Sequence, residues 1–498
     1  MGVGVSREWG SVDRFFSITA RGSDVGTEVR GGIVTFITMA YIIVLNPLII
    51  GTVPDSTGKY LGGGDAPNIA LIALATAVIA GLMTLLMGVV ARFPLALATG
   101  LGLNAFVTYS IATKFTWNVA MTLVFLEGVI ILFLVLTGFR LAVFKAIPAS
   151  LKTAISVGIG LFIALIGFVD AGFVRKAPAT PVELGIGGQL DGWPSLVFCF
   201  GLALVVALYA LRFRGAILIS ILFTTVVAMI IEAVAKVGPT FISPEESNPK
   251  GWNLNVPKWP DDIMNFPGVQ DLKDLWNLAI FDNIGGLGSA LSDFDAAAYV
   301  TLGLLVFTLL LADFFDTMGT MTAVGAEAGL LNEEGIPPES QKILVVDSIA
   351  AATGGAAAVS SNTSYIESAA GVGEGARTGL ASVVTGVLFL LAAVFSPLVA
   401  IVPFEAATPA LVLVGFLMMT QVKNIDWDDI EVALPAFLTI VLMPFTYSIT
   451  AGIGAGFLAY TLLKVVKGKS SQLHPLMWTI TGLFVIYFAI NPIEQLFS

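Results

Sequence analysis

The chain has 498 residues, of which 56% are hydrophobic and only 12% are charged, and its mean hydropathy is +0.91. So little polar surface cannot cover a soluble globule of this length, and the composition therefore predicts an all-α polytopic membrane protein. A formal net charge of −11 without any basic, aromatic-interleaved cluster gives no support to a nucleic-acid partner.

In chain order, residues 1–30 are charged and lack the apolar core of a signal peptide, so we expect a cytoplasmic N-terminal segment. A first series of spans is predicted at 31–51, 69–90, 95–111, 118–138, 149–168, 195–211 and 215–235. A polar loop over 237–298 follows, with a short surface helix expected near Leu272 to Leu278. A second series is predicted at 299–320, 343–358, 359–373, 378–395, 405–421, 430–449 and 451–467. The last apolar run, 475–490, is either a fifteenth span or a helix packed on the bundle.

The distribution of lysine and arginine predicts the orientation in a cell membrane. The basic residues of the first half fall on one side if the N-terminus is cytoplasmic, and the loop 237–298 is then outside. These basic residues are Arg7, Arg14, Arg21, Arg30, Arg92, Arg140, Lys145, Lys152, Arg212 and Arg214.

Two short polar segments occupy corresponding places in the two series. Seven spans in each half make the halves inverted relative to one another, and the third and tenth segments, from Pro94 and from Ala358, are both rich in Gly, Ser, Thr and Asn. Such interrupted segments in inverted halves point to a transporter's binding site. Each is expected to contain an extended stretch followed by a half-helix whose N-terminal N–H groups aim at one spot.

Carboxylates supply the other half of this predicted site. Asp313 and Asp316 end the apolar run of the eighth segment and share one helix face by spacing, and Glu367 lies in the tenth segment two residues after Tyr365. Acids at membrane depth are costly and point to a cavity or a substrate. Backbone donors together with carboxylate acceptors suit a neutral ring with C=O and N–H edges, such as a nucleobase.

Four stretches resemble the AzgA-like adenine/guanine/hypoxanthine permeases, which are related to the uracil, xanthine and ascorbate permeases. They are GGIVTFITMAYIIVLNP (31–47), ATGLGLNAF (98–106), ADFFDTMGT (312–320) and SSNTSYIESAAGVGEGARTGL (360–380). The resemblance implies fourteen spans in a 7+7 inverted repeat and proton-coupled uptake of purine bases. It also implies a core domain (31–138 and 299–395), a gate domain (139–236 and 396–498) and homodimers formed through the gate domain.

The resemblance also implies roles for individual residues. Asp316 and Glu367 stand where relatives have substrate-binding glutamates, and the shorter Asp316 leaves room for a bicyclic purine. Backbone donors are expected between Gly102 and Phe106. The predicted substrate-binding residues are Asp316, Glu367, Tyr365, Gly102, Asn104, Phe106, Thr38 and Ser364. The predicted proton carriers are Asp316, Glu367, Asp347 and Asp313. No metal or cofactor is predicted.

Several alternatives stay open at this point. Asp313 could be the ligand in place of Asp316, and Asp347 is either a proton relay or a structural acceptor. Glu127 and Asp170 are interpreted as structural or interfacial, and His474, the single histidine, as interfacial.

Two other classes of protein compete with a permease of nucleobases. An anion transporter of the sulfate-permease type shares the inverted architecture, although carboxylates suit anions poorly. An intramembrane aspartyl protease would pair Asp313 or Asp316 with Asp347. The small-xxx-small patterns, such as Gly81 with Leu85 and Gly454 with Leu458, mostly fail as packing motifs and are given no function.

Overall fold

The computed structural model describes residues 10–137, 147–177, 180–243, 246–260, 263–278, 296–333 and 336–497. Within these ranges, ten helices are long and apolar enough to cross a membrane, which confirms a mostly helical, multi-pass membrane protein. Three further apolar helices, at Leu101–Ala112, Ile430–Thr446 and Pro475–Ala489, are shorter. The count of fourteen spans therefore stays a prediction.

The elements follow the predicted order, with N-caps at several helix starts. Asp24, Asn68 and Thr116 each accept a hydrogen bond from a backbone N–H of the first turn that follows. The helices of the first half are α1 Gly10–Phe16, α2 Val25–Met39, α3 Ile42–Ile50, α4 Ile69–Leu86, α5 Leu101–Phe106, α6 Trp117–Leu136, α8 Ala149–Asp170, α9 Trp193–Ala210 and α10 Ala216–Ala235. Those of the second half are α13 Ala296–Glu327, α14 Ser340–Ala356, α15 Ser368–Gly373, α16 Gly379–Ala392, α17 Phe404–Ala407, α18 Pro409–Met419, α19 Ile430–Thr446, α20 Ile449–Val466 and α21 Pro475–Phe497.

Short strands and one loop helix complete the fold. The predicted surface helix is present as α11 Val269–Leu278. The strands are β1 Leu97–Thr99, β2 Val174–Arg175, β3 Glu183–Leu184, β4 Phe241–Ser243, β5 Glu246–Ser247 and β6 Asn362–Ser364, and they pair as β1–β6, β2–β3 and β4–β5.

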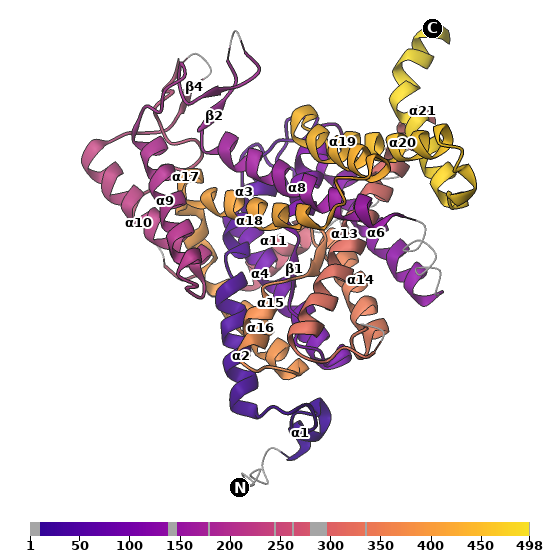
Figure 1. Ribbon diagram of the computed structural model, residues 1–498. Coiled ribbons are helices and arrows are strands. Elements are labelled where there is room, and N and C mark those ends of the chain that lie inside the picture. Colours follow the sequence, from indigo (N-terminus) through magenta and orange to yellow (C-terminus); the bar gives the residue numbers. More distant parts are fainter. Residues whose placement is uncertain are drawn as a thin grey trace.

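The large helices pack in two sets (Figure 1). In the first helix group, which comprises α2–α6 and α13–α16, α6 packs on α14 and α13, and α16 packs on α4 and α2. In the second helix group, which comprises α8–α10 and α17–α20, α8 packs on α18 and α19, and α9 packs on α10. Fewer residues touch between the groups, where α5 and α13 meet α8, α2 meets α10, and α13 meets α20. The last helix, α21, packs on α20 and α13.

Strands β1 and β6 hold the two broken segments together. They are antiparallel, with Leu97 opposite Ser364, Ala98 opposite Thr363 and Thr99 opposite Asn362. Each strand leads into a short helix, α5 or α15, as the prediction of an extended stretch followed by a half-helix requires. Both strands are completely buried, because unpaired backbone at membrane depth needs a partner from the protein itself.

Glycines allow the closest helix crossings, and here one prediction was wrong. Gly81 lies against Gly386, so that a Cβ atom built on either would meet the carbonyl oxygen of the other. Gly454 lies against the rings of Phe484 and Phe488 on α21. Both glycines therefore do pack, but against partners on other helices that an i, i+4 pattern does not reveal.

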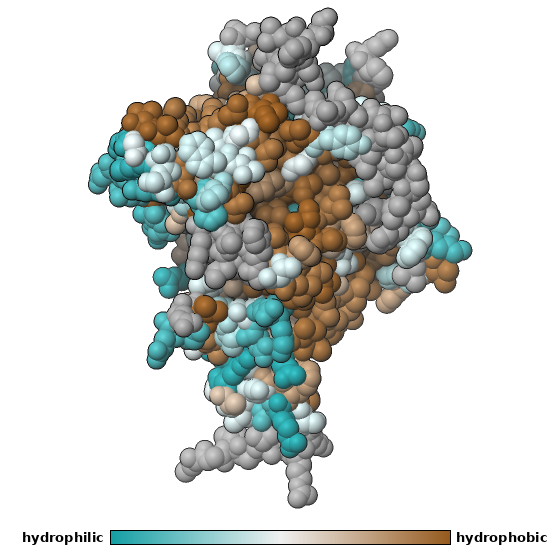
Figure 2. All heavy atoms as spheres, turned by 90° about the vertical axis from the view of Figure 1, so that its right-hand side faces the viewer, coloured by the Kyte–Doolittle hydropathy of each residue, from teal (hydrophilic) through white to brown (hydrophobic). Residues whose placement is uncertain are grey.

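The outer surface fits a membrane protein. Figure 2 shows apolar side chains over the centre of one face, with hydrophilic side chains gathered toward its ends. Phe133, Leu211 and Val234 are among the large hydrophobic residues that are exposed on the molecule. Since an exposed apolar area of this extent is unfavourable in water, the helices are suited to contact with lipid.

Candidate functional site

The site is built around the β1–β6 pair. The backbone N–H of Gly100 donates to the carbonyl of Ser361 (3.0 Å), and that of Tyr365 donates to the carbonyl of Ala96 (3.0 Å). The Tyr365 hydroxyl reaches across to the carbonyl oxygen of Thr99 at 2.5 Å. Tyr365 is buried and engaged in this crossing, so it shapes the site from within.

Glu367 sits at the N-terminus of α15 and is half-buried. Its carboxylate Oε1 accepts a hydrogen bond from the Tyr41 hydroxyl, which lies between α2 and α3. Thr38 approaches the backbone of Glu367, with 3.5 Å from its Oγ1 to the Glu367 carbonyl oxygen. The Thr38 hydroxyl also donates to the carbonyl of Thr35 in its own helix at 2.9 Å.

Asp313 and Asp316 differ sharply in exposure although they lie three residues apart on α13. Asp313 is fully buried, and its Oδ2 accepts a hydrogen bond from the Ser361 hydroxyl at 3.4 Å. Asp316 is surrounded by protein, yet its side chain remains open to solvent. Three residues correspond to about 300° of helix rotation, which leaves an offset of about 60° between the two side chains. This offset separates a sealed acid from one that solvent reaches.

Asp347 on α14 is a hydrogen-bond acceptor for two hydroxyl groups. Its Oδ2 accepts from Thr317 Oγ1 and its Oδ1 accepts from Ser364 Oγ, both at 2.7 Å. Thr363 Oγ1 lies 2.8 Å from Thr317 Oγ1 and is the donor there, because the Thr317 proton goes to Asp347. The predicted substrate-binding hydroxyl of Ser364 is therefore turned toward Asp347.

The third segment contributes mainly backbone. Asn104 is buried and donates to Thr99 Oγ1 at 3.1 Å, and Phe106 is buried in the core. Gly102 is half-buried, and a Cβ atom there would strike Ile159 of α8. In the described chain no hydrogen bond occupies the N–H groups of Gly102 and Leu103.

The tenth segment does not offer donors in the same way. The N–H groups of Ser368, Ala369 and Ala370 are engaged by the carbonyls of Tyr365, Ile366 and Glu367. The available backbone donors therefore come from α5, and the tenth segment supplies side chains.

Contacts between the two helix groups flank this site. Lys152 of α8 lies 5.0 Å from the ring centre of Phe315 on α13. Tyr109, which follows α5, donates to Oδ2 of Asp170 at the end of α8 (3.2 Å) and packs edge-on against Tyr447. Asp170 thus lies where the two helix groups meet. His474 lies away from the site and caps α21 by accepting from the N–H of Leu476.

Glu127 of α6 is the acid whose position the sequence did not reveal. It is fully buried, and its carboxyl group lies against those of Asp313 and the hydroxyl of Ser361. Within the described residues, no group of three His, Cys, Asp or Glu side chains has the arrangement needed to hold a metal ion.

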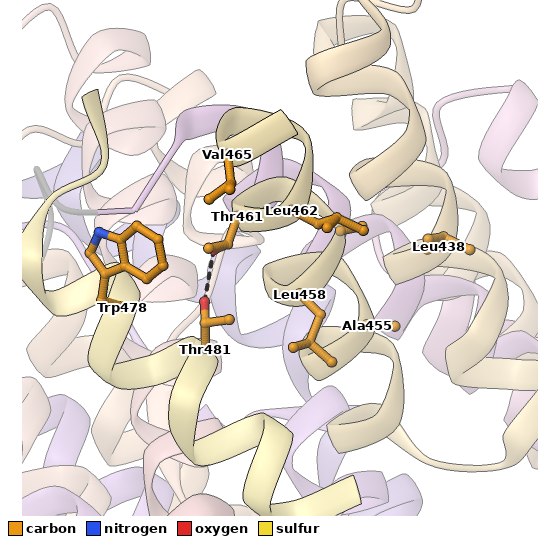
Figure 3. A pocket seen from close by; sticks show the side chains of 9 residues that line it. Leu438, Ala455, Leu458, Thr461, Leu462, Val465, Trp478 and Thr481 are labelled. Carbon is orange, nitrogen blue, oxygen red and sulfur yellow. Dashed lines mark hydrogen bonds between the residues drawn. The ribbon is translucent and has the colours of Figure 1, made fainter. Parts of the chain in front are cut away.

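A separate groove of about 550 Å³ lies between α19, α20 and α21 (Figure 3). Its lining is apolar except for Thr461 and Thr481, which hydrogen-bond each other at 2.8 Å. With its two hydroxyls already paired, this groove offers a polar ring little to bind, in contrast to the acids and hydroxyls around β1 and β6.

Comparison with known proteins gives clear relatives over nearly the whole chain. The model of the permease family Xan_ur_permease matches residues 26–455. The guanine/hypoxanthine permease PbuG of Bacillus subtilis is 36% identical over 476 residues, which are 95% of this chain and 98% of that protein. The adenine permease AdeQ of Escherichia coli is 34% identical over 484 residues, covering 97% of each chain.

Solved structures show a shared fold at low sequence identity. The transmembrane domain of the cyanobacterial bicarbonate transporter BicA aligns with a TM-score of 0.54 at 15% identity, over 86% of this chain and 97% of that one. The murine anion transporter Slc26a9 aligns with a TM-score of 0.56 at 13% identity, over 94% and 74% of the two chains. At this identity the likeness concerns the fold.

Proposed function

Because this chain belongs to the permease family whose model matches residues 26–455, and permeases are transporters rather than enzymes, we propose that it carries purine nucleobases across a membrane. The relatives that are named as guanine/hypoxanthine and adenine permeases support this class of substrate. Membership of a permease family also argues against the alternative of an intramembrane aspartyl protease, because permeases are transporters.

One observation supports the substrate class most directly: two accessible acids, Asp316 and Glu367, stand near each other beside the β1–β6 crossing. Carboxylates accept the N–H groups of a purine, and the N–H groups of Gly102 and Leu103 suit its carbonyl or ring-nitrogen acceptors. A ring that lacks one of these groups would leave a buried polar atom unpaired. The other predicted residues then surround these groups and hold them in place: Tyr365, Asn104, Phe106, Thr38 and Ser364.

The competing function is anion transport, which the fold of BicA and Slc26a9 favours. The side chains argue against it. An anion would meet the carboxylates of Asp316, Glu367 and Asp347, which repel it, and hydroxyl groups donate hydrogen bonds to Glu367 and Asp347. Purine transport is therefore the better match to the chemistry of the site.

We propose further that uptake is proton-coupled and proceeds by alternating access. The first helix group would act as the core domain and the second as the gate domain, moving as bodies about the β1–β6 site. The smaller number of contacts between the groups than within them supports this division. One of Asp316, Glu367, Asp347 or Asp313 would carry the proton. The cell membrane, a cytoplasmic N-terminus and dimers through the gate domain complete the proposal.

Uptake into proteoliposomes tests the proposed function. Radiolabelled hypoxanthine is offered with an excess of unlabelled adenine, guanine, hypoxanthine, xanthine, uracil or sulfate. We expect purines to compete and sulfate to have no effect; competition by sulfate alone would reject the proposal. Glu367→Gln should abolish uptake, whereas Glu327→Gln, at the exposed end of α13, should behave as wild type.

A further inference from the structure

Glu127 and Asp313 present an unusual arrangement of buried oxygen atoms. Both side chains have no exposed surface. Within the described residues, three of their four carboxyl oxygens lack a hydrogen-bond partner: both oxygens of Glu127 and Oδ1 of Asp313. The Ser361 hydroxyl donates to Oδ2 of Asp313 over a long 3.4 Å, and the Thr363 hydroxyl lies beside the same carboxyl group. An unpaired carboxylate in such a place is costly, so the lack of donors needs an explanation.

The two acids explain each other. Glu127 on α6 and Asp313 on α13 lie within hydrogen-bonding reach, but two carboxylates are both acceptors and cannot bond. If one of them holds a proton, its O–H becomes the missing donor and the other accepts it. Two like charges at this separation, out of water, also disfavour ionisation of both.

Among the residues that the structure describes, the charged groups facing the pair are acids. The titratable groups that face the pair are Asp347 from α14 and Asp316 from the next turn of α13, both acids. The hydroxyl of Ser361, just before β6, and that of Thr363, within β6, also lie beside the pair. A second negative charge on the pair would therefore meet only repulsion from its acidic neighbours.

From this geometry we propose that Glu127 and Asp313 form the proton-binding pair of the transporter. The pair holds one shared proton, and loss of that proton changes the affinity of the nearby substrate site. Ser361 ties Asp313 to the segment that becomes β6, and Asp316 is one helical turn away. When the proton leaves, no covalent bond other than the O–H bond changes. The added charge repels Asp316 and displaces Asp313 or the chain at Ser361, which weakens the purine site.

This inference rests on the proposed function and identifies Glu127, which touches no substrate, as a positioning residue for transport. It differs from a purely structural role in what Glu127→Gln should do. Glutamine has the same shape as glutamate and supplies a permanent N–H donor to Asp313, so folding should be preserved. Because the glutamine side chain cannot take up or release a proton, Asp313 no longer shares one with residue 127.

The test compares two assays on full-length protein in proteoliposomes. Hypoxanthine counterflow reports binding and movement without a gradient, and uptake under a pH gradient, acidic outside, reports coupling. With a gradient of about one pH unit, one coupled proton supports about tenfold accumulation. We expect Glu127→Gln to keep counterflow and its melting temperature but to lose accumulation. Glu405→Gln, a fully buried glutamate of α17 with an unpaired Oε2, is the matched control and should accumulate as wild type does.

Three outcomes would overturn the proposal. Glu127→Gln could accumulate hypoxanthine at the wild-type level, or it could lose counterflow and also melt at a lower temperature. Accumulation by wild type could also follow a sodium gradient instead of a pH gradient. If wild type shows counterflow with neither hypoxanthine nor adenine, the proposed function fails instead. In that case infrared spectroscopy tests the shared proton on its own: the band of a protonated carboxyl group must be present in wild type and absent in Glu127→Gln.

Discussion

The Tyr41 hydroxyl donates a hydrogen bond to Oε1 of Glu367 and so joins the break between α2 and α3 to the start of α15. These residues belong to opposite halves of the chain. Since Glu367 is only half-buried, this bond fixes the direction in which its carboxylate faces the site.

Tyr41→Phe removes this donor and leaves the ring in place. A hydrogen bond to a charged group is worth about 1.5 kcal/mol or more, so we expect purine affinity to fall roughly tenfold. Competition binding with hypoxanthine measures the change. Tyr460→Phe on α20 is the matched control and should bind as wild type. Equal affinity of Tyr41→Phe and wild type would show that Glu367 is oriented by other groups.

Asp347→Asn tests whether Asp347 is needed as a double acceptor. Asparagine has one oxygen for the two hydroxyls of Thr317 and Ser364, and its NH2 group faces the other donor. We expect a loss of about 1–3 kcal/mol in the free energy of unfolding, seen as a lower melting temperature in detergent. Asp428→Asn in an exposed loop should not change it. An unchanged melting temperature for Asp347→Asn would leave the proton-relay role as the better account.

Arg214→Gln tests an ion pair that crosses between the helix groups. Arg214, in the turn between α9 and α10, contacts Glu374 at the end of α15, and Arg30 of α2 contacts the same carboxylate at 3.2 Å. Both arginines are largely exposed, so the pair is worth about 0.2–1 kcal/mol, or up to about a fivefold change in a conformational equilibrium.

We expect Arg214→Gln to increase access to the site from the side that bears this pair. Exposed Ile366 is changed to cysteine in a Cys199→Ala background, and labelling by a membrane-impermeant maleimide is timed. High salt screens the ion pair, so it should raise the labelling rate of the protein that keeps Arg214. The labelling rates with and without Arg214→Gln should then differ less. Arg212→Gln, at a neighbouring exposed arginine, is the control, and an equal effect of both changes would count against a specific contact.

Asp55, in the loop before α4, makes one part of the stability depend on pH. Partial burial acts to raise its pKa, but hydrogen bonds from Thr57, Lys59 and Trp117 outweigh this and hold the pKa of Asp55 below its usual value. A lowered folded pKa gives stability that is present above the unfolded pKa, near 3.9, and lost as pH falls through the folded pKa. We expect Asp55→Asn to lower the melting temperature at pH 7 and to reduce its fall in acid. A parallel acid response in both proteins would contradict this.

Composition and hydrophobic runs were enough to predict the membrane class, the order of the helices and the breaks in the third and tenth segments. The breaks could be predicted because Gly, Ser, Thr and Asn in an apolar setting have few other physical explanations. The helix α11 also lies where the sequence placed it. The predicted domain limits and the seven-plus-seven repeat go beyond what the described helices establish.

The inner geometry of the site could not be predicted, because spacing along one helix does not say which neighbour a side chain meets. Asp313 and Asp316 share a face by spacing, yet one is sealed and the other open. Glu127 was assigned a structural or interfacial role because nothing in its own segment points to Asp313. Gly81 was dismissed for want of a small residue at Leu85, whereas its partner, Gly386, lies on another helix.

The pairing of β1 with β6 has a consequence for biosynthesis. Tyr365 and Thr99, which bond across this crossing, are 266 residues apart in sequence. When the first half of the chain has left the ribosome, the polar backbone of β1 still lacks the only strand that pairs with it in the described structure. The insertion machinery must therefore shelter residues 97–99 from lipid until β6 has been translated, and a chain truncated before Asn362 should be retained by quality control however well its early helices insert.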